Sequence, residues 1–137
     1  MHSILVKDYM DNNPHAIKHS ESVRDVVKYL LKEKLSGAPV IDDDKNLMGF
    51  VSEQDCLTEV LNDAFYCEET PNVKTVMTSN TVTTTPETSI VELAQQMAKS
   101  TPRNYPVVKN GKLIGLISRN SILNAIIEYN EDCYLQH

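Results

Sequence analysis

The stretch SGAPVIDDDKNLMGFVSEQD, residues 36–55, decides the fold, because a related stretch returns as NYPVVKNGKLIGLISRNS at residues 104–121. Each copy has a short apolar run with a proline, a turn, and a second apolar run that ends in serine. Two such runs separated by a turn predict a β-hairpin, and Asn110-Gly111 in the second copy is a strong turn signal. The chain is therefore predicted to form the same hairpin twice.

The similarity between the two copies extends along nearly the whole chain at a constant offset. VKDYM at residues 6–10 matches VKTVM at residues 73–77, an offset of 67 (73 − 6). After the acidic turn that contains Asp42–Asp44 the offset falls to 66, as between Leu57 and Leu123 (123 − 57). A register kept over an entire unit indicates a tandem repeat. We place the first repeat at residues 1–66 and the second at residues 67–137.

Each repeat is predicted to run strand, helix, strand, strand, helix. Ser22 and Ser89 are each followed three residues later by an acidic residue, which is an N-cap signal for the first helix. Apolar residues at i, i+3, i+4, i+7 and i+8 follow both serines and predict an amphipathic helix. A short strand at residues 15–18 and 82–84 precedes these helices. Residues 62–72 lack periodicity and are predicted to be the linker.

Composition limits the class of protein. The chain has 137 residues, 41% of them hydrophobic, and no apolar run of about 18 residues, so no membrane insertion is expected. Its net charge is −6, all of it in residues 1–68 (seven basic, thirteen acidic), which argues against nucleic acid as a partner. The N-terminus does not look like a secretory signal, and three cysteines without motif spacing favour reduced thiols. We therefore expect a cytoplasmic protein.

The repeated pattern resembles the CBS domain, with a proline-valine strand and a second strand that ends in Gly, two apolar residues, Ser and, three residues later, Asp. The resemblance covers nearly the whole chain. It implies an α+β fold in which two tandem β-α-β-β-α units pack about a pseudo-twofold axis, with clefts where they meet. It also implies a regulatory module that senses a ligand, commonly an adenosine nucleotide and sometimes an S-adenosyl ligand.

Ser52 and Asp55 stand where the family has its ribose-binding pattern of Ser or Thr followed three residues later by Asp. A carboxylate can accept charge-assisted hydrogen bonds from both ribose hydroxyls, and the first turn of a helix favours a negative group. The alternative is that Asp55 only caps the helix that follows. The second repeat has Ser118 and Ser121 at these positions, so the carboxylate is missing there and we expect a weaker second site.

The resemblance further implies that each site takes its ribose group from one repeat and its other contacts from the opposite repeat. The main site is predicted to contain Ser52, Asp55, Val82, Thr83, Thr84, Arg103, Tyr105 and Pro106. The weaker site is predicted to contain His15, Ala16, Ile17, Ser36, Pro39, Ser118, Arg119 and Ser121. Arg103 can fork onto a phosphate or be a solvated charge. Tyr105 either stacks on a purine or belongs to the core.

Catalytic and metal chemistry find little support in the sequence. His15 and His19 are four residues apart, but they bracket a predicted strand and lack further ligands at matching spacing, so no metal site is expected. Cys56 has no base at its repeat position and is predicted to be a packing residue, while Cys67 lies in the linker without a motif. Hydrolysis of a nucleotide would need an activated water, and no base accompanies the predicted site. We expect no enzymatic activity and no cofactor.

The predicted ligand is AMP, ADP or ATP, with an S-adenosyl ligand or NAD less favoured. Apolar residues on more than one face of the last helix, namely Ile122, Leu123, Ile126 and Ile127, indicate a homodimer. The module would signal to a partner protein that no motif identifies. The alternative is an interaction or dimerisation module that has lost its ligand.

Overall fold

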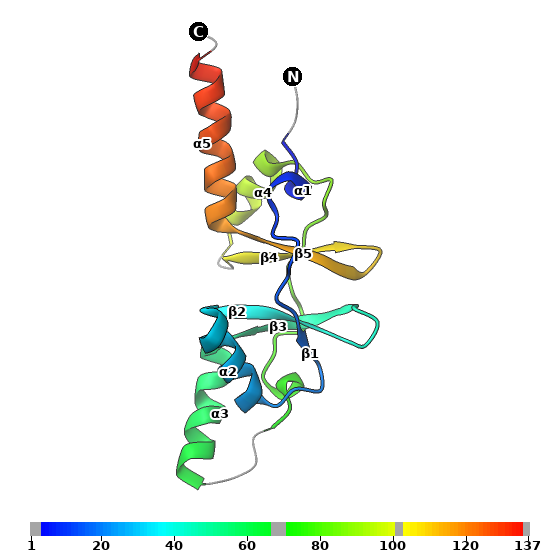
Figure 1. Cartoon of the computed structure of the whole chain (residues 1–137), viewed down its shortest axis with the longest axis vertical. Helices are drawn as coiled ribbons and strands as arrows, with labels where there is room; N and C mark the ends of the chain where they lie inside the picture. Colours follow the sequence, from blue (N-terminus) through cyan, green and yellow to red (C-terminus); the bar gives the residue numbers. More distant parts are fainter. Residues whose placement is uncertain (1–3, 67–70, 101–102, 136–137) are drawn as a thin grey trace. The chain divides into compact units, whose positions relative to one another are not determined.

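The computed structural model describes residues 4–66, 71–100 and 103–135 and divides the chain into two compact units (Figure 1). His15–Thr81 form one unit, which we call the central unit. Met1–Pro14 and Val82–His137 form the other, which we call the terminal unit because both ends of the chain belong to it. The compact units therefore differ from the sequence repeats, because the segment that opens each repeat packs with the opposite repeat.

The central unit contains a three-stranded sheet with helices packed beside it. Its elements are β1 (Ile17–Lys18), α2 (Val23–Glu33), β2 (Gly37–Ile41), β3 (Leu47–Ser52), α3 (Glu53–Tyr66) and the 3₁₀ helix η1 (Val73–Thr75). The strand order is β1-β2-β3, with β1 parallel and β3 antiparallel to β2. The predicted order of strand, helix, strand, strand, helix is confirmed.

The terminal unit repeats this arrangement. Its elements are α1 (Val6–Tyr9), α4 (Ile90–Met97), β4 (Asn104–Lys109), β5 (Lys112–Ser118) and α5 (Arg119–Leu135). β4 and β5 form an antiparallel hairpin. Thr84 makes a parallel bridge to Val107, which corresponds to the pairing of Ile17 with Val40 in the central unit. The predicted strand at residues 82–84 is thus present as a single bridge.

The first helix of each repeat begins where the serines predict. The Ser22 hydroxyl accepts a hydrogen bond from the Asp25 N–H at 3.1 Å, and Ser89 does the same for Glu92 at 3.0 Å. Each bond satisfies one backbone N–H that the first turn leaves without an intrahelical partner. Both N-cap predictions are therefore confirmed.

The two hairpin turns differ in sequence and in how they close. Asn110 and Gly111 both have positive φ angles, 54° and 79°, as a two-residue type I′ turn requires. The acidic turn instead closes through Asp42, whose Oδ1 accepts the N–H groups of Asp44 and Asn46, each at 2.9 Å. One of the three consecutive aspartates thus has a structural role.

The predicted linker at residues 62–72 is partly wrong, because α3 continues through Tyr66. Apolar periodicity marks the buried face of a helix and does not mark where its backbone ends. Asn72, at the end of the predicted linker, also has structure, because it forms an antiparallel bridge with Ser22 and its side chain accepts the Lys74 N–H at 2.8 Å.

Backbone hydrogen bonds join the segment that opens each repeat to the opposite repeat, an arrangement that we call segment exchange. The exchanged segments are residues 4–14 and residues 71–81. Asp11, which precedes the first repeat's hairpin, bonds in both directions with Leu116 of β5, at 2.8 and 3.0 Å. Thr78, which precedes the second repeat's hairpin, bonds in the same way with Phe50 of β3, at 2.8 and 2.9 Å. Each sheet therefore gains a short antiparallel partner from the segment before the opposite repeat.

Each unit has its own apolar core. The core of the central unit comprises Ile17, Val23, Val26, Leu30, Ala38, Val40, Val51, Cys56 and Val73. The core of the terminal unit comprises Val6, Ile90, Leu93, Met97, Tyr105, Val107, Ile117, Ile122 and Ala125. Val6 and Val73, each fully buried, come from the exchanged segments, so these segments are part of the cores.

Candidate ligand-binding site

Ser52 and Asp55 form a reciprocal pair at the junction of β3 and α3. The Asp55 N–H donates to the Ser52 hydroxyl at 3.1 Å, and the Ser52 N–H donates to Oδ2 of Asp55 at 2.9 Å. This is the geometry of a capping box, so the capping role of Asp55 is present. The other carboxylate oxygen, Oδ1, has no hydrogen-bond partner among the described residues. Capping therefore holds the carboxylate in place and still leaves an acceptor for a ligand.

Ser118 and Ser121 occupy the same junction in the terminal unit, between β5 and α5. The Ser121 N–H donates to the Ser118 hydroxyl at 3.2 Å, and the two hydroxyl oxygens lie 3.1 Å apart. The two side chains thus bond to each other, and neither carries a charge. The Asp55 carboxylate thus has no counterpart at this junction, and the weaker second site stays a prediction.

The main-site residues of the second repeat lie together around β4 in the terminal unit. The Thr84 N–H donates to the Pro106 carbonyl at 3.0 Å, and Thr84 is buried. Val82 is 47% exposed, which leaves an apolar surface beside this bridge. Arg103 is exposed at the start of β4. The strand pairing therefore brings Thr84 and Pro106 of the predicted main site together.

Tyr105 belongs to the core of the terminal unit. Its side chain is 1% exposed, and its hydroxyl hydrogen-bonds with the hydroxyl of Ser100. Of the two roles that the sequence left open, the packing favours the core role, because a fully covered ring offers no face to a purine. The sequence could not distinguish the two roles, since both place an aromatic residue before the strand proline.

The predicted weaker-site residues of the first repeat lie around β1 and β2 of the central unit. His15 has a positive φ angle of 54°, which is a left-handed backbone conformation, and it lies two residues before the start of β1. Ile17 and Pro39 are buried, whereas Ser36 is exposed at the start of β2. Ile17 is a core residue, so only His15, Ala16 and Ser36 keep accessible side chains in this set.

Cys56 follows Asp55 but points into the core. It is fully buried, and this burial raises the pKa of its thiol. The negative charge of the neighbouring Asp55 raises the pKa further, by a smaller amount. A raised pKa keeps the thiol protonated at neutral pH, and the thiolate is the reactive form. The predicted packing role is therefore confirmed. Cys67 lies outside the described residues.

His15 and His19 do not come together with further ligands. Within residues 4–66, 71–100 and 103–135 no group of three His, Cys, Asp or Glu side chains could hold a metal ion. Nε2 of His19 instead lies 3.7 Å from Oδ1 of Asp43 in the acidic turn. The second member of the predicted Asp42–Asp44 turn thus contacts a histidine.

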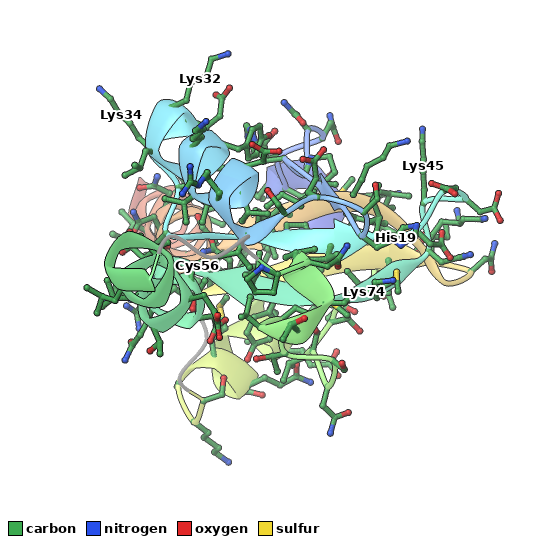
Figure 2. The ribbon with its side chains drawn as sticks, turned by 90° about the horizontal axis from the view of Figure 1, so that it is seen from below. His19, Lys32, Lys34, Lys45, Cys56 and Lys74 are labelled. Carbon is green, nitrogen blue, oxygen red and sulfur yellow. The ribbon has the colours of Figure 1, made fainter. Side chains whose placement is uncertain are left out.

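An apolar groove lies between α2 and α3 of the central unit, with a volume of about 170 Å³. It is lined by Val27, Leu30, Leu31, Glu53, Cys56, Leu57 and Val60. Leu31 and Leu57 are 71% and 58% exposed. Figure 2 labels Cys56 on this side of the unit and shows Lys32 and Lys34 pointing away from the end of α2. The sequence did not predict this groove, because Leu31 continues the apolar spacing of the buried residues of α2 and so looks like another core residue.

A hairpin and two helices that occur twice, with a serine-capped turn after each second strand, define a tandem α+β repeat. The sequence profile of the CBS domain matches residues 6–62 and residues 73–128. The chain therefore belongs to the CBS domain family and carries two copies of the domain.

Curated relatives share this family but differ in length. The protein MJ1426 of Methanocaldococcus jannaschii is 28% identical over 90% of this chain and 92% of its own length. The chloroplastic CBS domain-containing protein CBSX2 of Arabidopsis thaliana is 28% identical over 93% of this chain and 65% of its own length. The chain spans only 42% of the length of MJ1225 from Methanocaldococcus jannaschii. It spans 23% of the length of an inosine-5'-monophosphate dehydrogenase from Nitrosopumilus maritimus.

Solved structures of CBS pairs have the same fold. A crystal structure of CBSX2 in complex with AMP is 31% identical, covers 93% of this chain and 98% of its own, and has a TM-score of 0.81. A second structure of CBSX2 from Arabidopsis thaliana is 28% identical, with a TM-score of 0.82 and coverage of 95% and 99%. The predicted fold class is thereby confirmed. In the part of the chain that the structure describes, no helix is both long and apolar enough to cross a membrane.

Proposed function

We propose that this chain is a regulatory module that binds an adenosine nucleotide and transmits the binding to a partner protein. The observation that carries the proposal is the Ser52–Asp55 pair, which fixes a carboxylate whose Oδ1 has no hydrogen-bond partner in the part of the chain that the structure describes. The related protein CBSX2, which has the same fold, has been crystallised in complex with AMP, and this supports the proposal. Asp55 is the proposed ribose contact, and Arg103 is the proposed phosphate contact. Because Asp55 is assigned to the ribose and no base is assigned to the phosphate end, we propose binding without turnover.

Replacing Asp55 with alanine is expected to weaken AMP binding by about ten- to a hundredfold, because a hydrogen bond to a charged group contributes roughly 1.5–3 kcal/mol. Titration calorimetry with AMP, ADP and ATP measures the change. Asp25→Ala is the matched control, since Asp25 also lies in the first turn of a helix but outside the proposed site. Equal affinities in the native protein and in Asp55→Ala would contradict the proposal, as would two equal sites per chain.

A second candidate function, dimerisation, is favoured by the apolar groove and by a matching surface on the terminal unit. Leu57 and Leu61 are exposed on α3, and Leu123 and Ile127 are exposed at the same repeat positions on α5. Ile122 is buried in the core, so the last helix does carry apolar residues on two faces, as predicted. We propose that these helix faces form a homodimer interface, because exposed apolar patches of this kind mark association surfaces.

We expect light scattering behind size exclusion to give a dimer mass at tens of micromolar. Leu57→Glu places a charge in the groove and should shift the mass toward the monomer, because a buried charge without a partner opposes association. Thr58→Glu adds the same charge to the neighbouring exposed position and should leave the dimer intact. A monomer mass for the unmodified chain at these concentrations would reject the proposed interface.

A further inference from the structure

One helix of the central unit carries a row of basic residues. Arg24, Lys28 and Lys32 are exposed and stand four residues apart on α2, so they lie along one side of this helix. We call these three residues the basic row. Figure 2 shows Lys32 near the end of α2, where its side chain points away from the ribbon. Neither Lys28 nor Lys32 forms an ion pair with a residue in the described ranges.

The basic row contrasts with the charge of the unit to which it belongs. His15–Thr81 contain seven basic and twelve acidic residues, a net charge of −5 (7 − 12). Three of those seven basic residues form the row, whereas α3, on the other side of the groove, contains four acidic residues and no lysine or arginine. The positive charge of this unit is therefore concentrated on α2.

An exposed leucine lies directly beside the basic row. Leu31 is 71% exposed, the highest value among the exposed large hydrophobic residues of the described ranges. It stands three residues after Lys28 and one before Lys32, and it also lines the groove between α2 and α3. Apolar and basic side chains thus meet along the α2 side of the groove. Such a surface is complementary to a partner that has apolar and acidic residues side by side.

Neither the fold nor the stability of α2 explains the basic row. In the second repeat the corresponding helix, α4, has the same capping serine and buried face, but Val91 and Gln95 replace Arg24 and Lys28. Arg24 lies in the first turn, where the helix dipole disfavours a positive charge. Like charges four residues apart also destabilise a helix. The row is therefore unfavourable for α2 by itself and becomes favourable when an acidic partner lies along it.

We propose that the basic row and Leu31 form the docking surface for the partner protein, and that the partner contributes an acidic amphipathic helix. This helix lies along α2, with an apolar residue against Leu31 and acidic side chains opposite the row. The inference rests on the proposed function, which includes a partner protein but assigns it no contact surface. The proposed dimer contacts Leu57 and Leu61 belong to α3, the other wall of the groove.

A helix fits this surface better than an anionic membrane does. A helix is about 10–12 Å wide, so it can contact α2 without covering the acidic side chains around the row. A membrane is a broad surface that would also face the exposed Asp25 and Glu33 of α2 and Glu53 across the groove. These carboxylates are repelled by anionic lipids.

Fluorescence anisotropy with a labelled peptide tests the docking surface on the full chain. The probe is a synthetic amphipathic helix of about 18 residues built from leucine, alanine and glutamate, and a second peptide has lysine in place of glutamate. We expect the acidic peptide alone to bind, and salt to weaken the binding. The double variant Lys28→Glu with Lys32→Glu should lower the affinity by about tenfold, because each reversal replaces an attraction with a repulsion.

The matched control makes the same change of charge outside α2. Lys18→Glu with Lys74→Glu alters two exposed lysines of the central unit and should leave peptide affinity within about threefold of the native value. Leu31→Ala should weaken binding without changing its salt dependence, because the contact that it removes is apolar.

Failure of the docking surface is distinguishable from failure of nucleotide binding. Calorimetry with AMP should give the same affinity for the native chain and for Lys28→Glu with Lys32→Glu. Peptide binding without any nucleotide binding would support the docking surface and reject the ligand. No peptide binding, or equal binding to the native chain and to that variant, would overturn the docking surface. Binding of anionic vesicles in place of the peptide, or a monomer mass for the variant alone, would also reject it in favour of a membrane or a second copy.

Discussion

Deletion of residues 1–13 is expected to unfold the terminal unit. This segment contributes the fully buried Val6 and takes part in five backbone hydrogen bonds with the second repeat, two of them between Asp11 and Leu116. Burial of one valine stabilises by about 1.5–3 kcal/mol and each hydrogen bond by about 1 kcal/mol, together about 7 kcal/mol. A domain of this size has a total stability of roughly 5–15 kcal/mol, so the loss is comparable to the whole.

Urea denaturation followed by circular dichroism measures this effect. The shortened chain should lose part of its helical signal without denaturant, because α4 and α5 pack in the affected core. Lys7→Ala, at an exposed position of the same segment, is the matched control and should leave the unfolding midpoint in place. A full helical signal and a cooperative transition within about 1 kcal/mol of the native chain would contradict the predicted role of the segment.

Gly49→Ala is expected to destabilise the central unit by about 3 kcal/mol, at the upper end of the effect of overpacking. A Cβ atom at Gly49 would lie 2.5 Å from the Thr78 carbonyl oxygen, so the exchanged segment must move away from β3. That movement strains the two hydrogen bonds between Thr78 and Phe50. Glycine at this position is required by the close approach of a second backbone.

Gly115→Ala repeats the experiment in the terminal unit, where the new Cβ would lie 2.9 Å from the Asp11 carbonyl oxygen. We expect a smaller loss there, because the contact is less severe. Gln95→Ala, on the exposed face of α4, is the control and should change the unfolding free energy by less than about 0.5 kcal/mol. Unfolding midpoints of both glycine variants equal to the control would show that the exchanged segments can shift freely.

Most of the fold could be predicted from the sequence, because the signals that define it are local. Ser22 and Ser89 mark helix starts through hydrogen bonds to residues three positions away, and Asn110-Gly111 marks its turn through two positive φ angles. The exchange of segments could not be predicted, since it depends on contacts over long separations. Only Gly49 and Gly115, matched between the repeats, gave a hint of close backbone approach.

The candidate site was predicted in part for the same reason. The Ser52–Asp55 bonds span three residues, so a sequence pattern captures them. Whether Tyr105 is exposed depends on the packing of α4, β5 and α5 against β4, which periodicity alone does not determine. The proximity of Arg103 to Arg119 follows only once the hairpin register is known.

Segment exchange also sets the order in which the two units can become native as the chain leaves the ribosome. Asp11 emerges early, but its partner Leu116 is made 105 residues later (116 − 11). At about 5–20 residues per second, this is a wait of roughly 5–20 s. Phe50 and Thr78 are only 28 residues apart (78 − 50), so the central unit can close first. The segment that contains Val6 and Asp11 is therefore made long before the strand with which it pairs, and it is among the last parts of the terminal unit to fold.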